Sequence, residues 1–133
     1  MQHQLRFKHK FVTWNGRRLE PLMRDTPCLI RVTIRNISDA DFPGGTYEYV
    51  RVNWHNELLN LEVATSWSLE SMPKIAASAK YVLDLGFNPS MYGPAFFGLK
   101  LKAADDGAPV RYYTEDSKDS SEEDRYFFSV KNR

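Results

Sequence analysis

Apolar residues occupy every second position in at least five short segments of this 133-residue chain, and turn-forming residues separate these segments. The segment from Cys28 to Arg35 shows the pattern, because its even-numbered residues are apolar and most of its odd-numbered residues are polar. Side chains of a β-strand point alternately to opposite faces, so a period of two predicts a strand with one buried face. We therefore expect an all-β sandwich of antiparallel sheets.

The alternating segments predict seven or eight strands and no helix. The first predicted strand, residues 5–11, ends shortly before Asn15-Gly16, a pair that is typical of a tight hairpin turn. The other strands are expected within residues 28–37, 47–54, 59–63, 67–69, 79–87, 97–103 and 126–130. Their number and spacing favour an immunoglobulin-like sandwich over a closed barrel.

The length of the chain fits one domain covering residues 1–133, and a content of 42% hydrophobic residues is enough for a core. Residues 113–125 are polar and acidic, so they are predicted to form a long mobile loop. The one cysteine, Cys28, cannot form an internal disulfide and is expected to be a buried, inert thiol. We find no membrane-spanning segment and no secretory signal, which predicts a cytoplasmic protein if Met1 is the native start.

Charge is unevenly distributed along the chain. Residues 1–35 carry eight basic and two acidic side chains, whereas residues 103–125 carry three basic and eight acidic ones. These regions either neutralise each other within the fold or form a bipolar surface that contacts a partner protein or a second copy. The formal net charge of +1 argues against nucleic acid as the partner. If the last strand lies beside the first, the acidic loop would be close to the basic region.

The candidate binding residues are aromatic or basic. They are Trp14, Tyr47, Tyr49, Tyr112, Tyr113, Arg6, Lys8 and Lys10. Trp14 follows the first strand and Tyr112-Tyr113 precedes the acidic loop, so these rings are expected to be exposed, where rings anchor protein interfaces or stack on sugars. The first strand and the strand that carries Tyr47 and Tyr49 are expected to be sheet edges, at which a partner could add a strand.

The sequence contains no pattern of catalytic or metal-binding residues. His3, His9 and His55 lack the spacing of zinc ligands, and His9 lies on the apolar side of the first predicted strand. Acidic side chains between Glu115 and Asp124 could offer oxygen ligands, but the glycine-centred calcium loop is absent. We expect no metal and no cofactor. Asn36-Ile37-Ser38 also matches a glycosylation sequon, which matters only in a secreted eukaryotic chain.

Two short motifs resemble known sandwich domains over roughly residues 24–130. The run from Arg35 to Thr46, which contains Asn36-Ile37-Ser38 and Phe42-Pro43-Gly44-Gly45, resembles the loop after the second strand in the cell-adhesion-related domain of bacteria and archaea called CARDB. It is also similar to the four-tryptophan domain of selective-autophagy receptors, although Phe42 stands where those domains usually have Trp. Met72-Pro73-Lys74-Ile75 resembles their proline-containing link before a long strand, although Ala76-Ala77-Ser78-Ala79 replaces the usual Pro-Gly-Glu.

The resemblance implies an adhesion, scaffold or protein-recognition domain without a catalytic centre. Taken together with the residue patterns, it predicts a non-catalytic protein-interaction or structural module, which could be one domain of a larger adhesion or scaffold protein. Two alternatives stay open: a carbohydrate-binding module that uses exposed aromatic rings, and an accessory domain of an enzyme. A sugar-binding module would need coplanar rings that face solvent, whereas a protein module would need an apolar patch or an unpaired strand edge.

Overall fold

The computed structural model describes residues 2–56, 61–89, 92–114 and 119–132; between residues 50 and 70 it describes the backbone alone. Nine strands lie within the described residues. They are β1 (His3–Val12), β2 (Cys28–Asn36), β3 (Gly45–Asn56), β4 (Leu61–Met72), β5 (Lys80–Phe87), β6 (Gly93–Ala103), β7 (Val110–Thr114), β8 (Ser120–Ser121) and β9 (Asp124–Val130). Among the described residues, no helix has the length and apolar character needed to cross a membrane.

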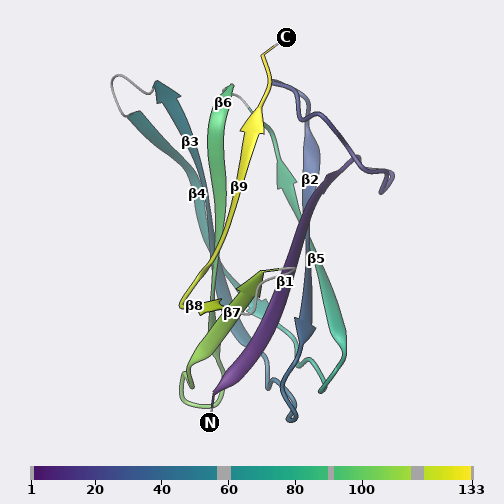
Figure 1. Ribbon diagram of the computed structural model, residues 1–133, viewed down its shortest axis with the longest axis vertical. Helices are drawn as coiled ribbons and strands as arrows, with labels where there is room; N and C mark the ends of the chain where they lie inside the picture. The colour runs from purple at the N-terminus through teal and green to yellow at the C-terminus, as the bar shows by residue number, and fades with distance from the viewer. Residues whose placement is uncertain (1, 57–60, 90–91, 115–118, 133) are drawn as a thin grey trace.

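The strands form two sheets that pack face to face (Figure 1). One sheet has the order β5-β2-β1-β7-β8, and the other has the order β4-β3-β6-β9. The predicted immunoglobulin-like sandwich is therefore confirmed. One pairing departs from the antiparallel pattern, because β1 and β7 run parallel to each other.

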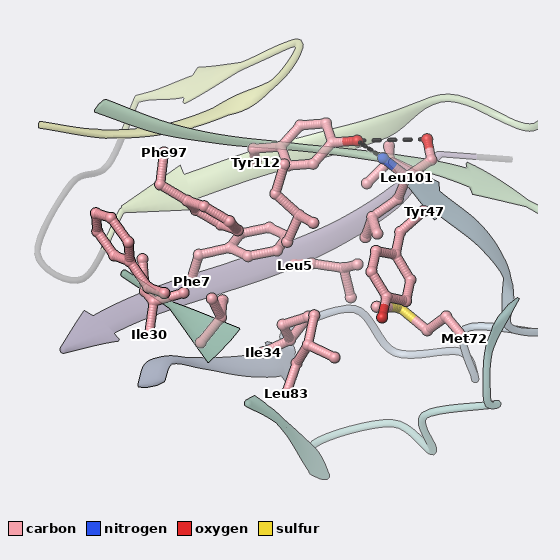
Figure 2. Close-up of a cluster of buried hydrophobic side chains, with 14 of the residues drawn as sticks. Leu5, Phe7, Ile30, Ile34, Tyr47, Met72, Leu83, Phe97, Leu101 and Tyr112 are labelled. Atoms are coloured by element: carbon pink, nitrogen blue, oxygen red, sulfur yellow. Dashed lines mark hydrogen bonds between the residues drawn. The ribbon is translucent and has the colours of Figure 1, made fainter. Parts of the chain in front are cut away.

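The core lies between the sheets and follows the alternation in the sequence. Leu5 and Phe7 of β1 are buried beside Ile34 of β2, while Phe97 of β6 approaches them from the second sheet (Figure 2). Cys28 is also buried, at the start of β2. Burial of these apolar side chains supplies the main driving force that holds the sheets together.

The expected sheet edges are wrong. β1 lies between β2 and β7, and β3, which carries Tyr47 and Tyr49, lies between β4 and β6. β3 pairs with both neighbours, and β1 pairs with β2 over residues 5–12 and with β7 over residues 3–7, so neither is an outer strand of its sheet. In the described part of the chain, the outer strands of the two sheets are instead β5 and β8, and β4 and β9.

The range 113–125 is not one continuous loop, because it includes the end of β7, all of β8 and the start of β9. β7 was not among the predicted strands, because its five residues carry only a short alternation. Residues 115–118 lie outside the described residues, as do residues 59–60 of a predicted strand. The last strand does not pair with the first, because β9 belongs to the opposite sheet.

Candidate binding site on the outer face of the five-stranded sheet

Basic side chains from three neighbouring strands line a groove on the outer face of β1, β2 and β5. The groove encloses about 340 Å³. We call this feature the basic groove, and its lining residues are Arg6, Lys8, Lys10, Thr33, Arg35 and Lys80. The structure thus brings three of the predicted site residues, Arg6, Lys8 and Lys10, to one place and adds Arg35 and Lys80 to them.

Strand register explains why these cations meet. Arg6 of β1 lies opposite Arg35 of β2, and Arg35 lies opposite Lys80 of β5. Their inward-facing neighbours, such as Ile34, are buried, so the alternation directs the charged side chains outward. Like charges that face each other across neighbouring strands destabilise a sheet, and a bound anion would relieve this repulsion.

Several contacts hold the groove in shape. The Nη1 atom of Arg6 donates to the carbonyl oxygen of Thr114 at 3.2 Å, and its guanidinium lies 5.8 Å from the centre of the Tyr113 ring. The Nη1 atom of Arg35 donates to the carbonyl oxygen of Ser78 at 3.0 Å. A backbone carbonyl carries no net charge, so these two hydrogen bonds hold the guanidinium groups in position without themselves neutralising them.

Asp84 is the one acidic residue in β1, β2 and β5, and it already has a partner. The guanidinium of Arg31 donates to both oxygens of Asp84, at 2.8 and 3.0 Å. This hydrogen bond raises the pKa of Arg31. Lys10, Arg35 and Lys80 form no ion pair with any residue that the structure describes. The groove therefore keeps an excess of positive charge.

Burial separates the predicted aromatic residues into two groups. Trp14 is 67% exposed, as expected, and Tyr113 is half-buried beside Arg6. Tyr112, which was expected to be exposed, is only 3% exposed, and Tyr47 is 6% exposed. Tyr49 is partly buried against Phe97. These residues therefore do not form the solvent-facing ring platform that a sugar-binding module would use, because two of the five belong to the core.

The hydroxyl of Tyr112 has a structural role that its sequence position does not reveal (Figure 2). The oxygen accepts the N–H of Leu101 at 2.6 Å and donates to the Leu101 carbonyl at 3.4 Å. β9 covers β6 only as far as Leu99, so Tyr112 satisfies backbone groups beyond that point. Burial raises the pKa of Tyr112 to about 12, although the Leu101 N–H acts in the opposite direction.

A larger hollow of about 770 Å³ lies where β3, β6 and β7 meet. Tyr47 and Tyr112 form part of its wall, together with residues of both charges, including Glu48, Lys100 and Arg111. This mixture does not favour a ligand of one charge. The basic groove is smaller but carries a single sign of charge, so it defines the ligand chemistry more sharply.

Two histidine–aspartate pairs were missed by sequence reasoning. The Nε2 atom of His3 lies 2.8 Å from Asp105, and the Nε2 atom of His9 lies 2.5 Å from Asp124. The alternation in the first strand correctly placed His9 on the apolar side, but its partner is 115 positions away and could not be identified. The His9 ring stacks on Tyr126 at 4.6 Å. The side chains of His9 and Asp124 are therefore buried, and we assign this pair a structural role.

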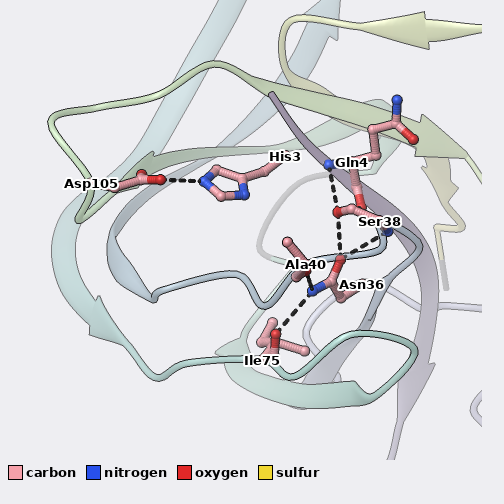
Figure 3. A network of polar contacts seen from close by, with 7 residues as sticks. All are labelled: His3, Gln4, Asn36, Ser38, Ala40, Ile75 and Asp105. Atoms are coloured by element: carbon pink, nitrogen blue, oxygen red, sulfur yellow. Dashed lines mark hydrogen bonds and ion pairs between the residues drawn. The ribbon is translucent and has the colours of Figure 1, made fainter. Parts of the chain in front are cut away.

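Asn36, the residue of the sequon, is fully buried and serves as a connector (Figure 3). Its Nδ2 atom donates to the carbonyl oxygens of Ala40 at 2.9 Å and Ile75 at 3.0 Å. Its Oδ1 atom accepts the N–H of Ser38 at 3.0 Å and the Ser38 hydroxyl at 2.7 Å. In the folded chain the amide nitrogen is therefore inaccessible to glycosylation, and the loop is tied to the segment before β5.

The described residues contain no group of three or more His, Cys, Asp or Glu side chains arranged to hold a metal ion. Glu115 and Asp116 of the suggested cation site lie outside those residues. Glu122 and Glu123 are exposed near β8, and each has a nearby arginine: Arg111 at 4.0 Å and Arg125 at 2.7 Å, respectively. Such exposed pairs neutralise charge locally and do not form a cage of oxygen ligands.

Comparisons with known proteins show the fold. No family profile matches the sequence, and no curated protein matches it. A crystal structure of a CARDB domain from Pyrococcus furiosus, in complex with di-metal ions, aligns over 98% of this chain and 87% of that chain, with a TM-score of 0.52 and 8% identity. A solution structure of the same domain gives a TM-score of 0.51 at 11% identity and covers 98% of this chain and 93% of that chain.

A β-glucosidase from Listeria innocua also contains a similar domain. The alignment with its D270A mutant in complex with laminaribiose covers 97% of this chain but only 16% of the enzyme chain, with a TM-score of 0.51 and 9% identity. The present chain thus corresponds to a small part of that enzyme. The resemblance to CARDB that the sequence motifs suggested is borne out at the level of the fold: this chain is a β-sandwich domain that resembles CARDB domains.

Proposed function

We propose that this chain is a non-catalytic interaction module that binds an anionic protein partner through the basic groove. The observation that carries the proposal is the convergence of Lys10, Arg35 and Lys80 from three adjacent strands, without an ion pair to any described residue. The CARDB-like fold supports the idea of a module, because it occurs as a separate domain and as a part of a larger enzyme.

An acidic protein segment fits this groove better than nucleic acid does. Sites for single-stranded nucleic acid usually combine a long basic track with several stacking rings. Here the basic side chains cover the width of three strands, and Tyr113 is the aromatic residue beside Arg6. The chain as a whole is almost neutral. Local charge complementarity with a carboxylate-rich protein segment is therefore the favoured mode.

A charge-reversal experiment tests the proposal. The double variant Lys10→Glu with Lys80→Glu should bind a fluorescent polyglutamate probe at least about tenfold more weakly than the parent chain at low salt. The control is Lys100→Glu with Lys102→Glu, which changes two exposed lysines of β6 by the same total charge. This control should weaken binding much less, because β6 lies in the other sheet.

Equal losses in both double variants would overturn the proposed site, since the probe would then respond only to net charge. A single-stranded oligonucleotide of matched charge is titrated in parallel. Stronger binding of the oligonucleotide than of polyglutamate would contradict the choice of a protein partner. Sedimentation velocity of the unliganded chain adds a further arm: a dimer dissociated by Lys10→Glu with Lys80→Glu would identify a second copy as the partner.

An accessory role in a larger enzyme is the second candidate, and sugar binding is its testable form. It is favoured by the similarity to part of the β-glucosidase and by the exposure of Trp14. Tryptophan fluorescence during titration with a β-linked glucose oligosaccharide tests it. A saturable change that disappears in Trp14→Ala would support sugar binding, whereas an unchanged spectrum would count against it.

A further inference from the structure

β5 is the outermost strand beside the basic groove. In the described part of the chain it pairs with β2 along one edge, and no strand pairs with its other edge. An edge of this kind is where an extended peptide can add itself to a sheet through main-chain hydrogen bonds. The direction of each backbone group along β5 decides whether such an addition would use the same residues as the groove.

The hydrogen-bond pattern fixes that direction. The N–H of Asn36 donates to the carbonyl oxygen of Ala79 at 2.9 Å, which places this pair on the bonded positions of the antiparallel ladder. Bonded and non-bonded pairs alternate along such a ladder. The continuous register from Arg35↔Lys80 to Arg31↔Asp84 therefore makes Lys80, Val82 and Asp84 members of non-bonded pairs. Their N–H and C=O groups point away from β2, towards the outer edge.

The side chains of these three residues lie on the outer face, next to the groove. Lys80 forms part of its wall, Val82 is 44% exposed, and Asp84 is held by Arg31. A strand added antiparallel to β5 places each bonded residue directly opposite Lys80, Val82 or Asp84, with its side chain on the same outer face. Of these side chains, the one opposite Lys80 would lie on the same face as Lys80 and Arg35, and the next two would lie opposite Val82 and Asp84.

We propose that an acidic, extended segment of a partner protein adds to the outer edge of β5 in antiparallel orientation. The partner carries carboxylates on alternate residues, so that one of them lies opposite Lys80. Lys80 on this edge strand opposes pairing with a basic residue at the position opposite it. This inference rests on the proposed function, because it names how an acidic partner is held at the basic groove.

Backbone methylation of a peptide probe tests the inference. The probe is a labelled eight-residue peptide in which Glu and Thr alternate, titrated by fluorescence anisotropy. In the proposed arrangement the Glu residues share the face of Lys80, and their N–H groups point to β5. N-methylation of the Glu residues should weaken binding at least about tenfold, whereas N-methylation of the Thr residues should not. The two methylated peptides have the same composition and the same charge, so they differ only in which backbone N–H groups are blocked.

Equal binding of both methylated peptides would overturn strand addition, and so would a loss confined to the Thr-methylated peptide. The proposed function would survive either result if Lys10→Glu with Lys80→Glu still abolished binding of the unmethylated peptide. If that double variant bound the peptide as well as the parent chain does, the proposed function itself would fail. The two ideas are therefore tested separately in one set of titrations.

A variant of β5 provides an independent check. Val82→Pro removes the one N–H at the centre of the outer edge, and proline is tolerated where this N–H faces solvent. It should weaken the unmethylated peptide at least about tenfold, while Val82→Thr should leave binding unchanged. Thermal unfolding of both variants shows whether the fold is retained. On unmodified protein, hydrogen exchange at the Val82 amide should slow when the peptide is added; an unchanged rate contradicts the proposal.

Discussion

The Nε2 atom of His9 lies 2.5 Å from the Oδ2 atom of Asp124, and this contact connects β1 of one sheet to β9 of the other. The two side chains are only 5% and 1% exposed. Buried polar groups are tolerated where they satisfy each other and are costly where a partner is missing. The pair should therefore contribute to stability as a unit.

Removal of the aspartate tests this relationship. We expect Asp124→Ala to lower the free energy of unfolding by about 2 to 3 kcal/mol, because His9 would stay buried without its partner. Urea denaturation measures the change. The exposed Asp39→Ala serves as the control and should change the free energy by less than about 0.5 kcal/mol.

A double variant separates the lost pair from the lost volume. His9→Phe with Asp124→Leu replaces both polar groups with apolar ones, and it should be less destabilised than the sum of its two single variants. Additive losses would show that the two side chains act independently, which contradicts the role assigned to the pair.

The pKa of Tyr112 predicts a pH dependence of stability. Its value in the folded chain is about 12, compared with an ordinary value of 10.0. Because the folded pKa is raised, this contribution is fully present below pH 10 and is lost as the pH rises towards 12. Over this range the parent chain should lose up to about 2 to 3 kcal/mol relative to Tyr112→Phe.

Urea denaturation of the parent chain and Tyr112→Phe at several pH values checks this expectation. Near pH 8, Tyr112→Phe should be less stable by about 1 kcal/mol, because the backbone groups of Leu101 lose their partner. The difference should narrow above pH 10 and change sign as the pH approaches 12, because the expected loss in the parent chain exceeds about 1 kcal/mol. A difference that stays constant with pH would contradict a buried, protonated phenol. The half-buried Tyr113→Phe is the control, because it keeps the Tyr112 contact.

These pairs also show where sequence reasoning was sufficient and where it was not. Alternation correctly placed His9 on the inner face of its strand and Arg6, Lys8 and Lys10 on the outer face, because that pattern depends on neighbouring residues alone. Which strands become neighbours depends on contacts between distant parts of the chain.

The order of the strands, and therefore which strands form the sheet edges, could not be predicted from the sequence. The groove needs Arg35 beside Lys80, a contact set by the pairing of β2 with β5. Tyr112 was expected to be exposed because it adjoins an acidic run. Because β7 pairs with β1 in the five-stranded sheet, the Tyr112 ring is instead buried in the core. The short alternation of β7 gave too weak a local signal to outweigh its polar surroundings.

Gly45 provides a test of the turn that leads into β3. Its φ angle is +149°, and a Cβ atom built on it would lie 2.0 Å from the carbonyl oxygen of Lys102. We expect Gly45→Ala to lower the free energy of unfolding by at least about 3 kcal/mol, because backbone atoms of the sheet would have to move. Chemical denaturation, or a sharp loss of soluble folded protein, would reveal this cost.

Gly86→Ala is the matched control for Gly45→Ala. A Cβ atom at Gly86 would meet no atom within 4 Å. Its substitution should change the free energy of unfolding by less than about 1 kcal/mol. Similar destabilisation by both substitutions would contradict the argument from close approach, because it would show that loss of any strand glycine has the same effect.

Asp84 makes the charge of the basic groove adjustable. Its carboxylate holds Arg31 through two hydrogen bonds, so Asp84→Asn removes a negative charge and leaves Arg31 as a further uncompensated cation. We expect this variant to bind polyglutamate about three- to tenfold more tightly at low salt, since the added field of one charge acts close to the ligand. Anisotropy titrations at two salt concentrations measure the gain, which should shrink as salt screens it.

Glu48→Gln, an equal change of charge at an exposed residue of the other sheet, should give a smaller gain. If Asp84→Asn bound polyglutamate no more tightly than Glu48→Gln, binding would depend only on the net charge of the chain. This result would contradict the assignment of the outer face of β1, β2 and β5 as the binding surface.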